Sequence, residues 1–335
     1  MDNLVNWLLK KEVWLGYRTR IDLLNEPENS PEAAESYKQM LNDAKIQQLL
    51  SELRNWPGPA MKRHNDAKLL YHKLAFLADI GVRQDQPVLA DTLQKILQSS
   101  TVEGPFQIPG NIPTVFGGSG RDEPMWMLCD APLISYALVK LGLGNEPAVQ
   151  KSVEYLLSLV KDFGWPCAAE TSLGNKFKGP GKRTHPCPYA NLLMLKLIGT
   201  LPELHHTPEA KLGLDMILSM WENRKSNRYF LFAMGTDFQK LKAPFVWFDI
   251  LHTAEVLSAF DLVWKDGRFI EMLDLVVSKA NAEGLYKAES IYMAWKGWDF
   301  GQKKLPSAWI TLLIYRILKR TKRLQSSKWL NESFT

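Results

Sequence analysis

The chain has 335 residues, of which 46% are hydrophobic and 23% charged, and it contains 12 Trp, 14 Phe and 10 Tyr. This composition supplies ample material for a large core and excludes a disordered chain. The formal net charge of +5 is modest, and its densest cluster, from Arg316 to Arg323, has no interleaved aromatic residues. We therefore expect no nucleic-acid partner.

The cellular compartment is predicted from the N-terminal residues, the length of the apolar runs and the spacing of the cysteines. No apolar run approaches the roughly 20 residues that span a bilayer, and the start Met1-Asp-Asn-Leu4 does not read as a signal peptide. Three widely spaced cysteines argue against a disulfide framework and are typical of a reducing compartment. We expect a cytoplasmic protein without a transmembrane segment, and the sequence says nothing of its oligomeric state.

The first helical signal runs from Leu4 to Leu24, with an interruption around Gly16. Ser30 followed by Pro31 then predicts a helix start, with Ser as the N-cap and Pro in the first turn. Helix starts with a proline recur along the chain, at Pro31, Pro87, Pro147 and Pro208, separated by 56, 60 and 61 residues. A period of roughly sixty residues fits one helical hairpin with its loops, so we predict a repeat of hairpins.

The second helix of each hairpin is expected where a polar group precedes a strongly apolar run. Such runs occupy residues 69–80, 133–141, 192–198, 250–260 and 309–318. A helix that is apolar nearly all round is buried on most sides, so these are predicted as inner helices and the proline-started ones as outer helices. Two closed rings of helices make an all-α, α/α toroid of about six hairpins. We expect residues 1–335 to form this single domain.

Several outer helices end in a glycine followed by an aromatic residue. The copies are Gly104-Pro-Phe106, Gly164-Trp165, the looser Gly284-Leu-Tyr286, and Arg228-Tyr229, which lacks the glycine. With these ends, residues 152–165 resemble the degenerate repeat of terpenoid cyclases and protein prenyltransferase β subunits, in which an outer helix ends in Gly-Trp or Gly-Phe. The resemblance to this squalene-cyclase-like superfamily implies an enzyme whose active site lies in the central cavity of the toroid.

The stretch from Gly179 to Leu197 concentrates the most chemistry at one helix start. Gly179-Pro-Gly181 forbids regular structure and Pro188 favours the first turn of a helix, so a helix is predicted to begin near Cys187. The amide groups and dipole of such a start favour a thiolate, an anion or a ligand. The simpler interpretation is that His185 and Cys187 only form a well-packed loop.

In a toroid the starts of the inner helices face one mouth of the cavity, so distant residues converge there. The predicted catalytic residues are His64, Asp66, Asp130, Cys187, Tyr189, Asp249 and His252. The predicted substrate-binding residues are Lys182, Asn191, Asp237, Lys240, Lys242, Trp247, Trp298, Asp299, Gln302 and Lys303. A small-molecule substrate is the expected partner.

Three aspartates among these residues have different alternative explanations. Asp66 and Asp130 are explained equally well as helix N-caps. Asp249 and His252 are expected inside a helix among apolar neighbours, where a carboxylate is costly unless it has a partner or a task. We therefore favour a functional role for Asp249.

The prenyltransferase resemblance also implies a zinc site. Prenyltransferase β subunits hold zinc with Asp-x-Cys at one inner-helix start and a His on the next, and the matching positions here are His185, Cys187 and His252. The chain departs from the family in having His where Asp is expected, although His also ligates zinc. It contains neither the Asp-x-Asp-Asp motif of alkene protonation nor an Asp-Asp-x-x-Asp magnesium motif.

Three functions therefore stay open at this point. The first is an isoprenoid-type enzyme whose aromatic residues shield a cation and whose lysines hold a phosphate. The second is an acid/base enzyme, a hydrolase or lyase, for a polar, sugar-like or carboxylated substrate. The third is a binding scaffold without catalysis, because fold does not fix function.

Overall fold

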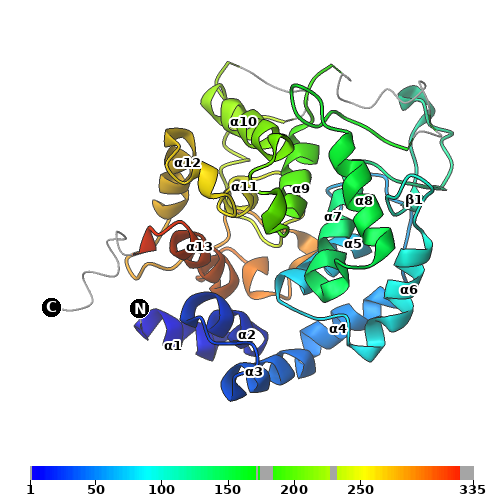
Figure 1. The fold of residues 1–335 in the computed structure, drawn as a ribbon. Coiled ribbons are helices and arrows are strands. Elements are labelled where there is room, and N and C mark those ends of the chain that lie inside the picture. Colours follow the sequence, from blue (N-terminus) through cyan, green and yellow to red (C-terminus); the bar gives the residue numbers. More distant parts are fainter. Residues whose placement is uncertain (1, 171–172, 174–183, 227–231, 325–335) are drawn as a thin grey trace. The chain divides into compact units, whose positions relative to one another are not determined.

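The protein is mostly helical, as the sequence predicts (Figure 1). The computed structural model describes residues 2–170, 173, 184–226 and 232–324. Within them the α-helices are α1 (Asp2–Lys11), α2 (Gly16–Thr19), α3 (Pro31–Asn42), α4 (Ala44–Leu53), α5 (Leu70–Asp79), α6 (Ala90–Gln98), α7 (Ala131–Leu138), α8 (Pro147–Ser158), α9 (Pro188–Ile198), α10 (Pro208–Glu222), α11 (Ile250–Leu257), α12 (Gly267–Val277) and α13 (Ala308–Arg320).

The chain divides into two compact units. Unit 1 comprises Met1–Gln48, Thr236–Phe245 and Asp249–Thr335, and unit 2 comprises Leu49–Gly235 and Val246–Phe248. Unit 1 is therefore built from both parts of the chain that flank unit 2. The single domain and the closed ring of hairpins stay predictions.

The proline helix starts are confirmed. Ser30 caps α3 by accepting a hydrogen bond from the amide of Ala33, and Thr207 caps α10 in the same way. Pro147 is the first residue of α8. Pro87 differs slightly, because it opens a short 3₁₀ turn, Pro87–Leu89, that leads into α6.

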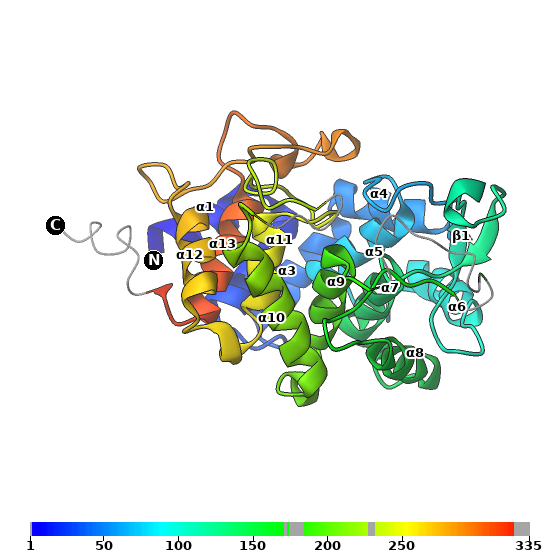
Figure 2. The ribbon, with the colours of Figure 1, turned by 90° about the horizontal axis from the view of Figure 1, so that it is seen from above.

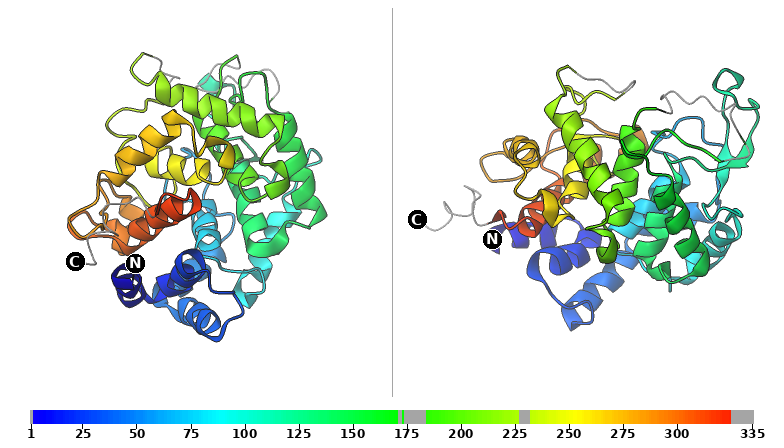
Figure 3. Two further views of the ribbon diagram at one scale, coloured as in Figure 1. Left: turned by 60° about the vertical axis from the view of Figure 1, so that its left-hand side comes forward. Right: turned by 45° about the horizontal axis from the view of Figure 1, so that its top comes forward.

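The apolar helices are also confirmed, with corrected ends. In unit 2 every residue of α7 and α9 is buried, and α9 packs against α7 and α10 (Figure 2). The run 133–141 does not form one α-helix, because α7 passes into a π-helical turn, Val139–Leu143, in which Gly142 has a φ of 101°. In unit 1 α13 packs against α11 (Figure 3), which ends at Leu257 rather than residue 260.

The glycine–aromatic ends form a recurring turn. Gly104, Gly164 and Gly284 all have positive φ, and the aromatic residues that follow them are buried. In unit 2 the amide of Trp165 donates to Oδ1 of Asn191, four residues after the N-cap of α9. In unit 1 the amide of Tyr286 donates to Oγ1 of Thr311, four residues after the N-cap of α13. The sequence repeat is thus a structural repeat, which we call the Gly–aromatic lock; the Arg228-Tyr229 copy lies outside the described residues.

A small sheet between α6 and α7 was not predicted. Strands β1 (Ile108–Gly110) and β2 (Glu123–Met125) pair antiparallel, with Ile108 opposite Met125. Short strands of this kind leave little alternating pattern in a sequence. Among the described helices, none has the length and apolar character needed to cross a membrane.

Candidate functional site

In unit 2, His64 from the loop before α5 lies close to Asp130 from the segment before α7. Asp130 directly precedes α7 and is fully buried. Its side chain does not cap the helix, since Oδ1 instead accepts a hydrogen bond from the amide of Met127 at 3.0 Å. Its second oxygen, Oδ2, lies 3.5 Å from Nδ1 of His64. Asp130 therefore occupies the predicted N-cap position of α7 without a side-chain cap hydrogen bond, and its carboxylate faces an imidazole.

The loop that carries His64 is held by two residues of α5. The carbonyl oxygen of His64 accepts from the hydroxyl of Tyr71 at 3.2 Å and lies 2.7 Å from Nε2 of His72. Burial lowers the pKa of His72 to about 4. Burial also raises the pKa of Tyr71 well above its usual value, and the charge of Asp130 adds to this shift. Both side chains are thus neutral at pH 7, and they position His64.

The side chain of His64 is only partly buried. Nδ1 is buried against Asp130, yet 22% of the side-chain surface of His64 is exposed. The exposed surface therefore belongs to other atoms of this side chain. A carboxylate beside Nδ1 favours the tautomer with its proton there, which leaves Nε2 as the basic nitrogen.

Two buried thiols belong to the same region. The Sγ atoms of Cys129 and Cys187 lie 3.9 Å apart. A hydrogen bond from the Cys129 thiol lowers the pKa of Cys187, and the amides of Tyr189 and Ala190 at the start of α9 lower it further against the effect of burial. The same contact and burial raise the pKa of Cys129. The helix start at Cys187 is confirmed, whereas Cys129 was missed because a single buried cysteine carries no sequence signal.

Tyr189 and Asn191 are engaged in holding the fold. The hydroxyl of Tyr189 donates to the carbonyl of Val246 at 2.8 Å, and its ring packs on Trp247 at 4.4 Å. The amide of Asn191 donates to the carbonyls of Trp165 and Cys187 and accepts from the amide of Trp165. Their polar atoms therefore already have partners within unit 2.

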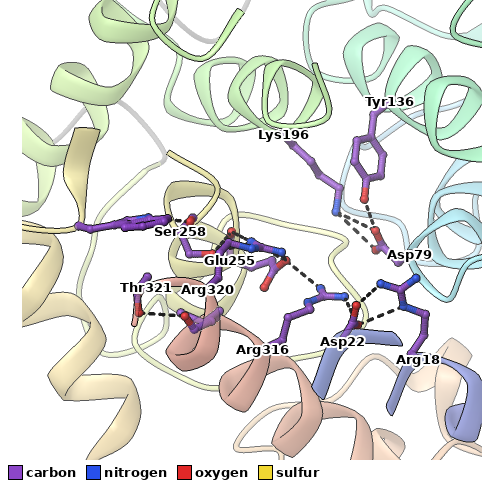
Figure 4. Close-up of polar contacts among 12 residues, drawn as sticks. Arg18, Asp22, Asp79, Tyr136, Lys196, Glu255, Ser258, Arg316, Arg320 and Thr321 are labelled. Carbon is purple, nitrogen blue, oxygen red and sulfur yellow. Dashed lines mark hydrogen bonds and ion pairs between the residues drawn. The ribbon is translucent and has the colours of Figure 1, made fainter. Parts of the chain in front are cut away.

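A second buried network in unit 2 was not predicted at all. Asp79 at the end of α5 accepts from the hydroxyl of Tyr136 on α7. Nζ of Lys196 on α9 lies 3.4 Å from both Asp79 oxygens and 4.5 Å from the centre of the Tyr136 ring (Figure 4). Because it joins three packed helices, this network ties the core of unit 2 together.

In unit 1 the prominent group is Asp249. Asp249 was predicted inside a helix, but it is the N-cap of α11. Its Oδ1 accepts a hydrogen bond from the amide of His252 at 3.0 Å. Within the described part of the chain, its buried Oδ2 has no hydrogen-bond partner. Burial raises the pKa of Asp249 to about 7, against the positive charge of Lys242. His252 is buried and stacks on Phe245, with ring centres 4.7 Å apart.

Further predicted ligands of unit 1 lie in surface loops. The exposed carboxylate of Asp237 pairs with Lys240 at 3.2 Å and with Lys242 at 2.9 Å. Lys242 is 8% exposed, and so it places a buried cation between Asp237 and Asp249.

The polar side chains of the loop before α13 form hydrogen bonds within the loop and to the start of α13. Oδ2 of Asp299 accepts from the hydroxyl of Ser307 and from the amide of Trp309, so it supports the start of α13. The amide group of Gln302 bonds only to backbone atoms of the same loop. Trp298 packs on other aromatic residues, and Lys303 is exposed.

The remaining predicted residues are placed as follows. Asp66 is exposed and bonds the amide of Lys68 in a turn, so it is not the N-cap of α5, which is Leu69. His185 is exposed before α9, and Lys182 lies outside the described residues. No three His, Cys, Asp or Glu side chains of the described residues are placed to hold a metal ion. The zinc prediction therefore gains no support.

Comparisons with known protein families and curated proteins found no match. The resemblance to terpenoid cyclases and prenyltransferases therefore stays a prediction, and the functional argument depends on the geometry of His64 and Asp130.

Proposed function

We propose that this protein is an acid/base enzyme, a hydrolase or lyase acting on a small polar, sugar-like or carboxylated substrate, in which His64 transfers the proton. The observation that supports it is the contact between the fully buried Asp130 and the partly exposed His64, 3.5 Å apart. A buried carboxylate beside a partly exposed imidazole is an arrangement that suits proton transfer.

The proposed step begins with Nε2 of His64, which removes a proton from the substrate. The imidazolium that forms is stabilised by the negative charge of Asp130, and it then returns the proton to the leaving group. The separation of 3.5 Å between Nδ1 and Oδ2 is longer than a hydrogen bond, and we expect it to shorten when the imidazole becomes charged.

The same proposal includes an α/α toroid that works in the cytoplasm. The Gly–aromatic lock, present in both units, supports a chain made of repeated hairpins. All three cysteines are free, which suits a reducing compartment. This keeps the terpenoid-cyclase-like architecture in the proposal, while the chemistry is carried by His64.

The test is turnover of a panel of uronic-acid oligosaccharides, glycosides and hydroxy acids, followed by proton NMR. We expect His64→Gln to lower turnover about 100-fold or more, and Asp130→Asn to lower it strongly with a changed pH profile. His185→Asn, an exposed histidine of the same unit, is the matched control and keeps full activity. Turnover by His64→Gln at the rate of the unsubstituted protein contradicts the proposal, as does a panel that the unsubstituted protein leaves untouched.

A further inference from the structure

All three cysteines of the chain gather in one part of unit 2. Cys129 and Cys187 are in direct contact, with 3.9 Å between their Sγ atoms. The segment around Cys167 runs beside both, because Pro166 pairs with Pro186 and the amide of Leu128 donates to the carbonyl of Ala168 at 3.0 Å. Sequence positions 58 residues apart thus place two thiols side by side.

The two thiols in contact are chemically unequal. Cys187 is the N-cap of α9, where the amides of Tyr189 and Ala190 stabilise a thiolate. Cys129 lies in the turn before α7, and its contact with Cys187 and its burial raise its pKa. A thiolate and a neighbouring thiol are the two parts that thiol–disulfide exchange requires.

We propose that Cys187 and Cys129 form a redox-active dithiol that is oxidised to an internal disulfide by a low-molecular-weight disulfide such as glutathione disulfide. The thiolate of Cys187 attacks one sulfur of the small disulfide, whose S–S bond breaks and releases one thiolate. Cys129 gives its proton to that thiolate and attacks the Cys187 sulfur, releasing the second small-molecule sulfur as a thiolate. Two protein thiols lose two electrons, and one small disulfide gains them. The inference is independent of the proton-transfer role of His64.

Geometry favours the internal bond over other products. The sulfur atoms must approach from 3.9 Å to about 2.05 Å, and both cysteines stand outside the regular turns of α7 and α9. Rotation of the two side chains therefore brings the sulfurs together without unwinding a helix. Only 7% of Cys187 and 8% of Cys129 is exposed, so the mixed disulfide is a crowded intermediate that the buried Cys129 resolves.

The experiment uses the full, reduced chain in glutathione buffers of graded ratio. Free thiols are counted with a maleimide after denaturation, and the linked peptides are identified by mass spectrometry. We expect a Cys129–Cys187 peptide that dithiothreitol reverses, in the unsubstituted protein and equally in the control Cys167→Ser. Cys129→Ser is expected to stop at a mixed disulfide of glutathione on Cys187.

A second measurement tests the inequality of the two thiols. At pH 7 iodoacetamide is expected to alkylate Cys187 about tenfold faster than Cys129. Glutathione attached only to Cys167, a linked pair that contains Cys167, or equal alkylation of the two thiols overturns the proposal. These outcomes are read in the unsubstituted protein and in Cys167→Ser, so a Cys129→Ser variant that fails to fold does not affect the decision.

Discussion

Burial sets Asp249 apart from the exposed carboxyl groups of unit 1. Its side chain is fully buried at the start of α11, and only Oδ1 has a hydrogen-bond donor within the described residues. Water cannot solvate the carboxylate there, so the pKa rises to about 7 although Lys242 opposes the shift. Asp237, by contrast, is exposed, and its bond to Lys242 holds its pKa below the usual value.

We predict that Asp249→Asn removes a pH dependence of stability. The folded pKa of about 7 lies above the unfolded value of 3.8, so the folded state holds the extra proton between these values. The free energy of unfolding therefore falls as pH rises from about 4 to 7, by up to about 4 kcal/mol. Urea unfolding at pH 5 and pH 8 measures this: the Asn variant should exceed the parent by less than about 2 kcal/mol at pH 5 and by about 4 kcal/mol at pH 8. Asp274→Asn, an exposed carboxylate of the same unit, is the control.

The sequence pointed to Asp249 and Asp130 as candidate site residues, but it did not predict which groups they contact. Apolar neighbours identified Asp249 as an unusual carboxylate, but its N-cap position depends on where α11 begins. Asp130 looked like a cap, and its real partner, His64, comes from 66 residues earlier in the chain. Local patterns predict helix starts because the capping groups are neighbours in sequence. They do not predict a contact that tertiary packing creates.

We predict that Asn191→Ala destabilises unit 2. The substitution leaves the amide and carbonyl of Trp165 and the carbonyl of Cys187 without the side chain that now bonds them. The two carbonyls still accept from the backbone amides of Cys187 and Asn191, so only the amide of Trp165 loses its partner. One unsatisfied buried group costs about 1 to 3 kcal/mol, which is the loss expected in urea unfolding. Asn223→Ala, which removes one exposed bond, should change stability by about 0.5 kcal/mol or less. A stable Asn191→Ala protein would show that the lock is dispensable.

At the scale of elements, the Gly–aromatic lock explains why the repeat is visible in the sequence. The chain must reverse after an outer helix, and a glycine with positive φ allows the turn. The aromatic side chain is then buried, and the backbone amide of that residue donates a hydrogen bond to a side chain of the next inner helix. The proline starts were predicted correctly because capping is local. The glycines do not end the helices, since α6, α8 and α12 stop at Gln98, Ser158 and Val277, before Gly104, Gly164 and Gly284. How the hairpins assemble is encoded in long-range packing, and the toroid therefore stays a prediction.

We predict that Gly164→Ala weakens this lock. Gly164 has a φ of 97°, and an added Cβ would lie 2.5 Å from Oδ1 of Asn191. Backbone strain and the displaced Asn side chain together should cost about 1 to 3 kcal/mol. Gly235→Ala is the matched control in the same unit, because no atom lies within 4 Å of its added Cβ. Equal melting temperatures for the two variants would contradict this account.

At the scale of the whole molecule, unit 1 joins residues nearly 300 positions apart through buried charges (Figure 4). Asp22 bonds Arg18 and, at 3.2 Å, Arg316 of α13; Arg316 and Arg320 both reach Glu255 of α11. Burial alone would raise the pKa of Asp22, but the two guanidinium groups hold it below 3.8. The network therefore anchors the N-terminal segment to α13.

We predict that Asp22→Asn strongly destabilises unit 1. Arg18 and Arg316 would lose their shared carboxylate, and breaking a buried pair costs about 3 to 5 kcal/mol. Because the folded pKa of Asp22 is depressed, its contribution is present above the unfolded value of 3.8 and is lost as pH falls below it. Urea unfolding at pH 7 and pH 3 should show a gap between variant and parent that narrows in acid. Asp274→Asn, in an exposed pair with Arg323, should cost less than about 1 kcal/mol.

The order in which the ribosome makes the chain acts unequally on the two units. Once residue 235 has left the ribosome, all of unit 2 except Val246–Phe248 has been synthesised and can pack. Unit 1 forms later, because α1 and the segment around Asp22 pack on α13, which is translated long after them. The apolar faces of its first helices thus stay uncovered during most of synthesis, which makes the first 48 residues the part of the nascent chain that most needs a chaperone.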